Sequence, residues 1–216
     1  MARILITSGP TRQYIDPVRF LSNASSGRMG AALAAAALNA GHEVLIVSGP
    51  VEITYPAGAE VIPVMTTEEM QRECHKHFPT CDGVIGVAAP CDYRPSTVAA
   101  QKISKNGERL VLSLEETPDI IASLGAVKQP HQWVVGFALE TEDPRLRAVR
   151  KMIAKNCDML VLNGPAAIDA LHSEVEVFGK ERSIIATLSG TKLELGREIF
   201  QLVERHLIQQ APQKHK

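Results

Sequence analysis

Residues 3–48 decide the fold, and they read RILITSGPTRQYIDPVRFLSNASSGRMGAALAAAALNAGHEVLIVS. The apolar runs RILIT and EVLIVS at the two ends have the length and the β-branched content of buried strands. Between them, residues 25–40 are rich in alanine and leucine at helical spacing. A strand, a helix and a second strand in this order predict a βαβ unit with two parallel strands.

The same alternation continues along the chain. Further strands are expected at residues 60–65, 83–88, 132–138 and 158–163, and further helices near 67–77, 118–127 and 144–156. Strands that are continuous apolar runs are typical of a parallel sheet covered on both faces. We therefore predict an α/β protein with a Rossmann-like, doubly wound, mainly parallel sheet and helices on both faces.

The C-terminal part departs from this rhythm. Residues 175–190 predict two strands around a Gly-Lys turn, and a closing helix follows with Thr191 as its cap. Residues 1–210 are interpreted as a single domain, and residues 211–216 as a disordered tail. The polar interval at residues 92–110 is too long for a plain connection, so we predict a mobile functional loop there.

Composition excludes several classes of partner. The 216 residues include 23 basic and 24 acidic ones, so no bulk attraction to nucleic acid or to a membrane surface is expected. No apolar run approaches the roughly 20 residues that span a bilayer. The four cysteines form no CxxC pair, as in a protein of a reducing compartment. We expect a cytoplasmic protein.

In such a sheet the ligand crevice lies at the carboxyl ends of the strands. The segment after the first strand has neither GxGxxG nor a P-loop. Instead, Ser25, Ser26 and Gly27 stand at the mouth of the alanine-rich helix, where free N–H groups and two hydroxyls can cradle an anion. A serine cap followed by a packing glycine fits the same residues. The carboxamide of Asn23 beside them can donate to a carbonyl and accept from an amine.

Two later segments also offer polar groups. In GVAAPCDYRP, small residues let a flat base approach the backbone, and Asp92 can meet a cation or a ligand hydroxyl. An ordinary turn carboxylate explains Asp92 equally well. Lys102 and Lys105 lie in the long loop, where lysines are usually solvated unless the loop closes over an anion.

The remaining candidates lie near the next two helices. Pro118 is interpreted as the first helical residue, with Asp119 among the capping candidates. Phe137 ends a strand, where an aromatic ring more often belongs to the core than to a stacking platform. Lys151 and Lys155 share one helix face, which is either a surface or an anion site.

Six segments together resemble a known family. SGPTRQYIDPVRFLSNASSGRMG, VAAPCDYRP, KISK, TPDII, VVGFALET and KMIAKNCDMLVLN are similar, in order and spacing, to the bacterial phosphopantothenoylcysteine synthetases. The resemblance runs from Ile4 to about Asn163 and continues more weakly into the closing helix. Its first block is the most specific.

The resemblance implies a phosphopantothenate–cysteine ligase of coenzyme A biosynthesis. CTP, with ATP as the other candidate, activates the carboxylate of phosphopantothenate as an acyl-cytidylate and releases pyrophosphate. The amine of cysteine then displaces CMP. Magnesium offsets the phosphate charge. The family's flavin decarboxylase domain has no counterpart in these residues, so only the synthetase step is predicted, with a separate phosphopantothenoylcysteine decarboxylase as a candidate partner. The resemblance also implies the family's usual homodimer.

The resemblance also assigns roles to single residues. Asn23 matches the family's catalytic asparagine, and Lys102 matches a lid lysine that assists activation of the carboxylate. Asp92 matches a contact to the nucleotide or its magnesium. The nucleotide-binding set is Ser25, Ser26, Gly27, Gly86, Val87, Ala88, Asp92, Lys102, Pro118, Asp119, Ile120, Ile121, Phe137, Lys151 and Lys155.

Some features depart from the family pattern. Pro90, Cys91 and Leu139 replace the residues usual at the base pocket, and residues 164–182 lack a clear Phe-x-Ser-Asp-x-Asn signature.

Two alternatives stay open: an NAD(P)-dependent reductase, which the missing GxGxxG disfavours, and a non-catalytic nucleotide sensor on the same fold.

Overall fold

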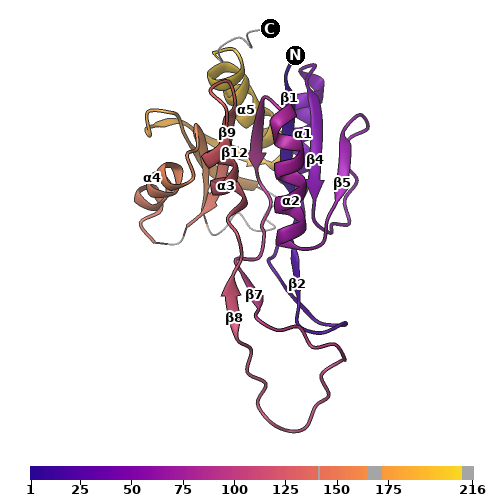
Figure 1. Ribbon diagram of the computed structural model, residues 1–216. Coiled ribbons are helices and arrows are strands. Elements are labelled where there is room, and N and C mark those ends of the chain that lie inside the picture. Colours follow the sequence, from indigo (N-terminus) through magenta and orange to yellow (C-terminus); the bar gives the residue numbers. More distant parts are fainter. Residues whose placement is uncertain (141, 165–171, 211–216) are drawn as a thin grey trace.

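The computed structural model describes residues 1–140, 142–164 and 172–210 (Figure 1). Its central sheet has eight strands in the order β12-β11-β10-β9-β6-β1-β4-β5. Their bounds are β1 (Arg3–Ser8), β4 (Glu43–Ser48), β5 (Glu60–Pro63), β6 (Gly83–Gly86), β9 (Trp133–Leu139), β10 (Met159–Asn163), β11 (His172–Phe178) and β12 (Ile184–Thr191).

The sheet is mainly parallel, as predicted. From β5 to β10 every neighbouring pair is parallel, and only β11 runs antiparallel to both of its neighbours. β1 lies inside this array, and its residues Ile4, Leu5 and Ile6 are fully buried because helices cover both faces. β12 therefore points the same way as β1, and both strands end at the carboxyl edge of the sheet.

Five α-helices flank the described sheet. They are α1 (Arg28–Asn39), α2 (Thr67–His77), α3 (Ile120–Val127), α4 (Pro144–Ala154) and α5 (Lys192–Val203); η1 (Phe78–Thr80) follows α2 and η3 (Glu204–Ile208) follows α5. One core joins Ile6 to Leu33 of α1 and Ile199 of α5. The other joins Leu5 to residues of α2, α3 and α4. The predicted helices on both faces are confirmed.

Small residues bring α1 close to its neighbours. A Cβ on Gly30 would lie 2.1 Å from the hydroxyl oxygen of Ser8 in β1. A Cβ on Gly196 of α5 would lie 2.6 Å from the Cβ of Ala32 in α1. α1 thus packs tightly against both the sheet and α5, which is what its alanine-rich sequence predicts.

Two helix starts differ from the prediction. α1 begins at Arg28 rather than at residue 25, because its N-cap Gly27 has a left-handed backbone with φ 75° and no side chain caps the helix. The alternative of a serine cap is therefore wrong. α3 begins at Ile120, so Pro118 is not its first residue; Asp119 is the cap and accepts the N–H of Ala122 at 3.0 Å. The predicted cap at Thr191 is confirmed by a capping box with Glu194.

Two small sheets at the carboxyl edge have no sequence prediction. β2 (Arg12–Tyr14) pairs with β3 (Phe20–Ser22), and β7 (Tyr93–Pro95) pairs with β8 (Leu114–Glu116). Strands of three residues are too short to show an alternating pattern. β7 takes up the start of the predicted loop, and the chain from residue 96 to 113 projects below the sheet (Figure 1).

The mobility of that loop stays a prediction, and the predicted tail at 211–216 lies outside the described residues. In the part of the chain that the structure describes, no helix combines the length and hydrophobicity needed to cross a bilayer.

Candidate functional site

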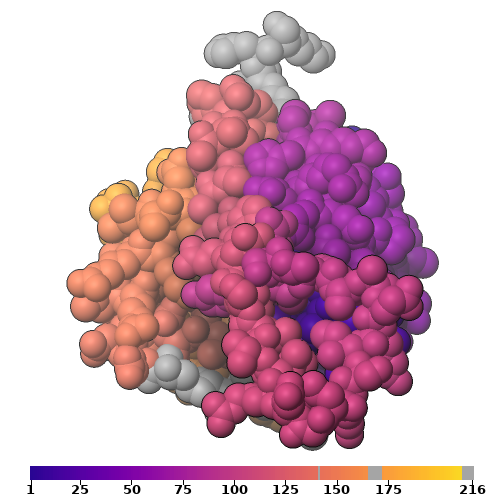
Figure 2. Space-filling model, turned by 60° about the horizontal axis from the view of Figure 1, so that its bottom comes forward, coloured from indigo at the N-terminus to yellow at the C-terminus, as the bar shows by residue number. Residues whose placement is uncertain are grey.

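Two adjoining cavities open at the carboxyl edge of the sheet. The first, which we call the α3 cavity, has a volume of about 330 Å³ and lies between the end of β6 and the start of α3. The second, the Asn23 cavity, has a similar volume of about 330 Å³ and extends toward α1 and α5. Ala88, Asp92, Phe137 and Lys155 line both. Seen from this edge, the N-terminal segment lies at the bottom of a hollow bordered by the long loop (Figure 2).

Most of the predicted residues meet at these cavities. Five predicted residues line the α3 cavity and not the other: Gly86, Pro118, Asp119, Ile120 and Ile121. Three predicted residues line the Asn23 cavity and not the α3 cavity: Asn23, Val87 and Lys151. These residues lie far apart in sequence, and the sheet order is what brings them together.

The α3 cavity has a narrow wall at Gly86. A Cβ added there would lie 2.2 Å from Cδ1 of Ile121, so only glycine lets β6 and α3 approach this closely. Two further lining residues are joined to each other, because Thr117 donates its hydroxyl to the carbonyl of Cys91 at 2.5 Å. Polar side chains such as Thr7 and Asp119 and the ring of Phe137 line the cavity together.

Cys91 is a wall residue rather than a nucleophile. Its side chain is buried, and burial raises the pKa of its thiol even though hydrogen bonds to its surroundings act the other way. The backbone N–H of Cys91 donates to the hydroxyl of Thr11 at 2.8 Å. This unusual residue therefore helps to hold the loop after β6 against β2.

Asn23 stands at the mouth of its cavity. Its Nδ2 donates to the carbonyl of Pro90 at 2.8 Å, and its side chain is exposed. The bond joins the segment before α1 to the loop after β6. Asn23 and Asp92 both line the Asn23 cavity.

Three lysines line the Asn23 cavity, and two of them are ion-paired with carboxylates. Lys151 lies 2.6 Å from Oε1 of the buried Glu140, and Lys155 lies 3.0 Å from Oδ2 of Asp119. Both lysines line the cavity, as their spacing predicts for one helix face. A third lysine, Lys192 at the start of α5, also lines it, and no sequence argument had singled it out.

Four predicted residues lie elsewhere. Ser25, Ser26 and Gly27 line neither cavity, and the Gly27 carbonyl accepts the hydroxyl of Ser8 at 3.3 Å. Lys102 lies in the projecting loop and also lines neither cavity. The roles of these four residues stay predictions.

The loop beside Lys102 is attached through Ile103. The N–H of Ile103 donates to Oδ2 of Asp16 at 3.1 Å, and the guanidinium of Arg19 donates to the carbonyl of Ile103. Asp16 also accepts the N–H groups of Val18 and Arg19, both at 2.8 Å. Sequence reasoning quoted Asp16 and Arg19 within the family block without giving them a role. The signal was an aspartate before proline, which is typical of a turn closed by its own side chain.

The pKa of Asp16 reflects this environment. Its side chain is completely buried, which by itself raises the pKa. The backbone hydrogen bonds from Val18, Arg19 and Ile103 and the charge of Arg19 outweigh that effect, so the pKa lies below its ordinary value. Asp16 is therefore an ionised anchor at neutral pH.

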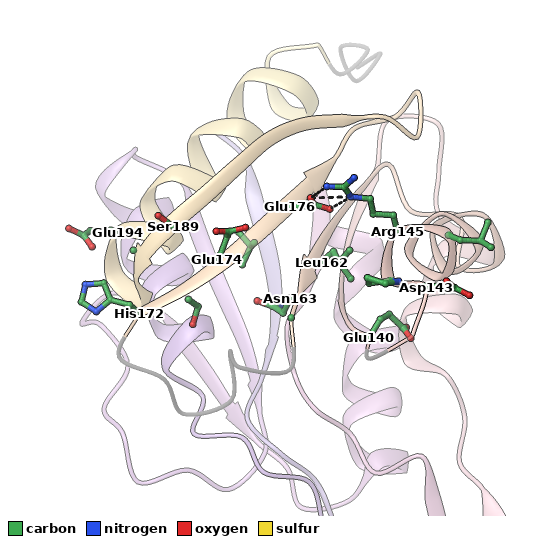
Figure 3. Close-up of a pocket in the computed structure, with 16 residues that line it drawn as sticks. Glu140, Asp143, Arg145, Leu162, Asn163, His172, Glu174, Glu176, Ser189 and Glu194 are labelled. Atoms are coloured by element: carbon green, nitrogen blue, oxygen red, sulfur yellow. Dashed lines mark hydrogen bonds and ion pairs between the residues drawn. The ribbon is translucent and has the colours of Figure 1, made fainter.

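A larger cavity of about 1030 Å³ lies beside β10, β11 and α4 (Figure 3). Carboxylates dominate its described lining: Glu140, Asp143, Glu174, Glu176 and Glu194. None of the predicted site residues lines it. Most of its charged lining groups are acidic, which disfavours an anionic ligand there.

Asp92 fits a magnesium ion held chiefly by a nucleotide. Mg²⁺ commonly binds one or two carboxylates together with substrate phosphates. Asp92 lines both cavities, so this residue lies where they meet. Within the described residues there is no cluster of three histidine, cysteine or acidic side chains that could hold a metal without such a ligand.

Comparison with known proteins identifies the family. The model of the DNA/pantothenate metabolism flavoprotein C-terminal domain matches residues 1–207. The chain belongs to this family. Within the flavoprotein C-terminal domain family, it is 45% identical over 163 residues to the coenzyme A biosynthesis bifunctional protein CoaBC of Vibrio cholerae. That match covers 74% of this chain and 41% of the relative, so the chain spans less than half the length of that curated protein.

Solved structures of the flavoprotein C-terminal domain agree. The crystal structure of the C-terminal domain of a CoaBC protein superposes with a TM-score of 0.83 and 38% identity, and covers 96% of each chain. A Cab2 variant in complex with phosphopantothenate-cysteine superposes with a TM-score of 0.80 at 15% identity, covering 96% of this chain and 88% of that one. The second likeness shows the shared fold alone.

Proposed function

We propose that this chain is a phosphopantothenate–cysteine ligase of coenzyme A biosynthesis. One observation carries the proposal: Asn23, Asp92, Lys151 and Lys155 line a single cavity that adjoins the α3 cavity. The reaction needs a nucleotide and an acyl group side by side, and two adjoining cavities supply that arrangement. The family membership and the CoaBC relatives support it.

In the first half reaction, an oxygen of the substrate carboxylate attacks the α-phosphorus of CTP and pyrophosphate leaves. The base would lie in the α3 cavity, whose lining includes Gly86 and Ile121. Lys151 and Lys155 would bind the phosphates, and Asp92 would hold the magnesium that offsets their charge. CTP is proposed over ATP from the family resemblance.

In the second half reaction, the amine of cysteine attacks the acyl carbon. A new C–N bond forms, the bond from that carbon to the phosphate oxygen breaks, CMP leaves, and the amine proton passes to solvent. The Asn23 carboxamide would orient the acyl group and stabilise the tetrahedral intermediate. This mechanism requires no nucleophile from the protein. The raised pKa of the Cys91 thiol fits a reaction without a thiolate.

A homodimer is part of the proposal. Apolar side chains gather on the β2–β3 hairpin and on the loop between β7 and β8: Val18, Val98, Leu110, Val111 and Leu114 are between 44% and 80% exposed. Exposed apolar side chains in a projecting region favour contact with a second copy. Light scattering after gel filtration tests this, and a mass of one chain would contradict it.

The remaining partners follow from the chemistry. The product keeps the carboxylate of cysteine, so a separate phosphopantothenoylcysteine decarboxylase is proposed to act next. A cytoplasmic location fits these small-molecule substrates and the free thiols of the four cysteines.

The test is turnover of the purified chain with phosphopantothenate, cysteine and Mg²⁺, with CTP and ATP assayed in parallel. We expect equal amounts of CMP, pyrophosphate and phosphopantothenoylcysteine with CTP. Saturable CTP binding without product would favour a nucleotide sensor. A thermal shift with NADPH but none with CTP would favour a reductase.

A further inference from the structure

Lys192 is the first residue of α5, and its side chain lines the Asn23 cavity. Its Nζ donates to the hydroxyl of Ser173 in β11 at 3.0 Å. Ser173 is itself 8% exposed, so its hydroxyl is a fixed acceptor that orients the ammonium group. Both residues belong to the C-terminal region in which the family resemblance is weakest.

The Asn23 cavity runs across the carboxyl edge of the sheet. Lys151 and Lys155 come from α4, on the face that α2, α3 and α4 cover. Met29 and Lys192 come from α1 and α5, on the opposite face. Asn163, the last residue of β10, lines the cavity at the sheet edge. A ligand whose nucleotide lies in the α3 cavity therefore extends its other end toward Lys192.

The charge of this cavity favours an anion. Among the residues that line it, three are lysines and one, Asp92, is acidic. Lys151 and Lys155 are ion-paired with Glu140 and Asp119, so the excess of positive charge is smaller than this count. Two of these lysines, Lys151 and Lys155, are on the nucleotide side. Lys192 places a positive charge at the far end, where no phosphate of the nucleotide is needed.

The position of Lys192 in its helix points to a role in binding. Positive side chains are disfavoured at a helix N-terminus, because the helix dipole is positive there. The rest of this turn follows the stabilising pattern, with Thr191 and Glu194 forming a capping box. A residue that breaks a local rule in an otherwise regular turn is expected where function requires it.

We propose that Lys192 binds the phosphate monoester of the acyl substrate, at the end of the Asn23 cavity opposite the nucleotide. The inference rests on the proposed ligase function and specifies how the same site selects a phosphorylated acid. A charge-assisted hydrogen bond from a partly buried ammonium to a dianion gives strong discrimination against the analogue that lacks the phosphate.

The experiment compares phosphopantothenate with pantothenate, which carries the same carboxylate without the phosphate. Wild type, Lys192→Gln, Lys192→Arg and Ser173→Ala are assayed with CTP, Mg²⁺ and cysteine. Equilibrium dialysis with labelled phosphopantothenate, in the presence of a non-hydrolysable CTP analogue, measures binding independently of turnover. Lys180→Gln is the matched control, because Lys180 is exposed in the turn between β11 and β12 at the other edge of the sheet.

For Lys192→Gln we expect the KM and the dialysis Kd for phosphopantothenate to rise roughly 10- to 100-fold. The KM for CTP and the KM for pantothenate should stay within about twofold of wild type, as expected for loss of one local contact. Lys192→Arg should restore most of the affinity, Ser173→Ala should show a smaller loss, and Lys180→Gln should match wild type.

An equal rise in the KM for phosphopantothenate and for pantothenate, or a raised KM for CTP alone, would overturn the assignment of Lys192. So would an unchanged Kd in Lys192→Gln. If wild type binds phosphopantothenate but makes no product, the ligase function fails while the dialysis result still decides the role of Lys192. If wild type does not bind phosphopantothenate, both proposals are wrong.

Discussion

The carboxylate of Asp16 accepts the backbone N–H of Ile103 at 3.1 Å, across a separation of 87 residues. Arg19, three residues after Asp16, donates to the carbonyl of the same residue. One short turn thus holds both backbone groups of Ile103 and attaches the long loop next to Lys102. If Lys102 acts on a bound carboxylate, this attachment limits where its side chain can reach.

Replacing Asp16 by alanine should release the loop. We expect trypsin to cleave after Lys102 and Lys105 several-fold faster than in wild type, because the backbone there opens more often. The control is Glu108→Ala, which removes an exposed carboxylate from the same loop. Equal cleavage rates in wild type and Asp16→Ala would show that other contacts hold the loop.

The stability contributed by Asp16 should depend on pH. Its pKa in the folded protein lies below the ordinary value of 3.8. The contribution is therefore fully present above the ordinary value and is lost as the pH falls through the lower folded-state value. In urea unfolding, the difference in free energy between wild type and Asp16→Asn should be constant above about pH 5 and should shrink below the ordinary value. Other carboxylates are common to both proteins and cancel. A difference independent of pH would contradict the assignment.

Replacing Asn23 by alanine should separate the two half reactions. We expect the rate of product formation to fall by about three orders of magnitude, as for the loss of one oxyanion donor, while pyrophosphate release stays partly intact. Assays of phosphopantothenoylcysteine and pyrophosphate on the same samples check this. Asn106→Ala, which changes an exposed asparagine of the long loop, is the control. Product formation at the normal rate would contradict the proposed role of Asn23.

Replacing Gly30 by alanine should disturb the contact between α1 and β1. The new Cβ would lie 2.1 Å from the buried hydroxyl of Ser8, so helix or strand must shift. We expect a loss of about 1 to 3 kcal/mol in the free energy of unfolding. Gly164→Ala, where a Cβ meets no atom of the described residues within 4 Å, should change it by less than about 0.5 kcal/mol. Equal effects of the two substitutions would contradict the packing argument.

Local patterns predicted most of the architecture. Apolar runs such as Glu43–Ser48 coincide with strands, and Thr191 caps α5 as its sequence predicts. These features depend on periodicity and capping within a few residues, which a single sequence contains. The starts of α1 and α3 were displaced by two or three residues, because the left-handed backbone of Gly27 and the choice of Asp119 as cap depend on how the preceding loops turn.

The sequence by itself determined a parallel α/β sheet and, through a specific block of motifs, the family and the identity of Asn23 as a candidate. Only the tertiary structure decided that Asn23 contacts Pro90, that Asp16 holds Ile103, and that Lys192 faces the same cavity as Lys151. The physical reason is range: hydrophobic periodicity reports on neighbouring residues, whereas contacts between distant segments depend on strand order and on how helices pack across the sheet.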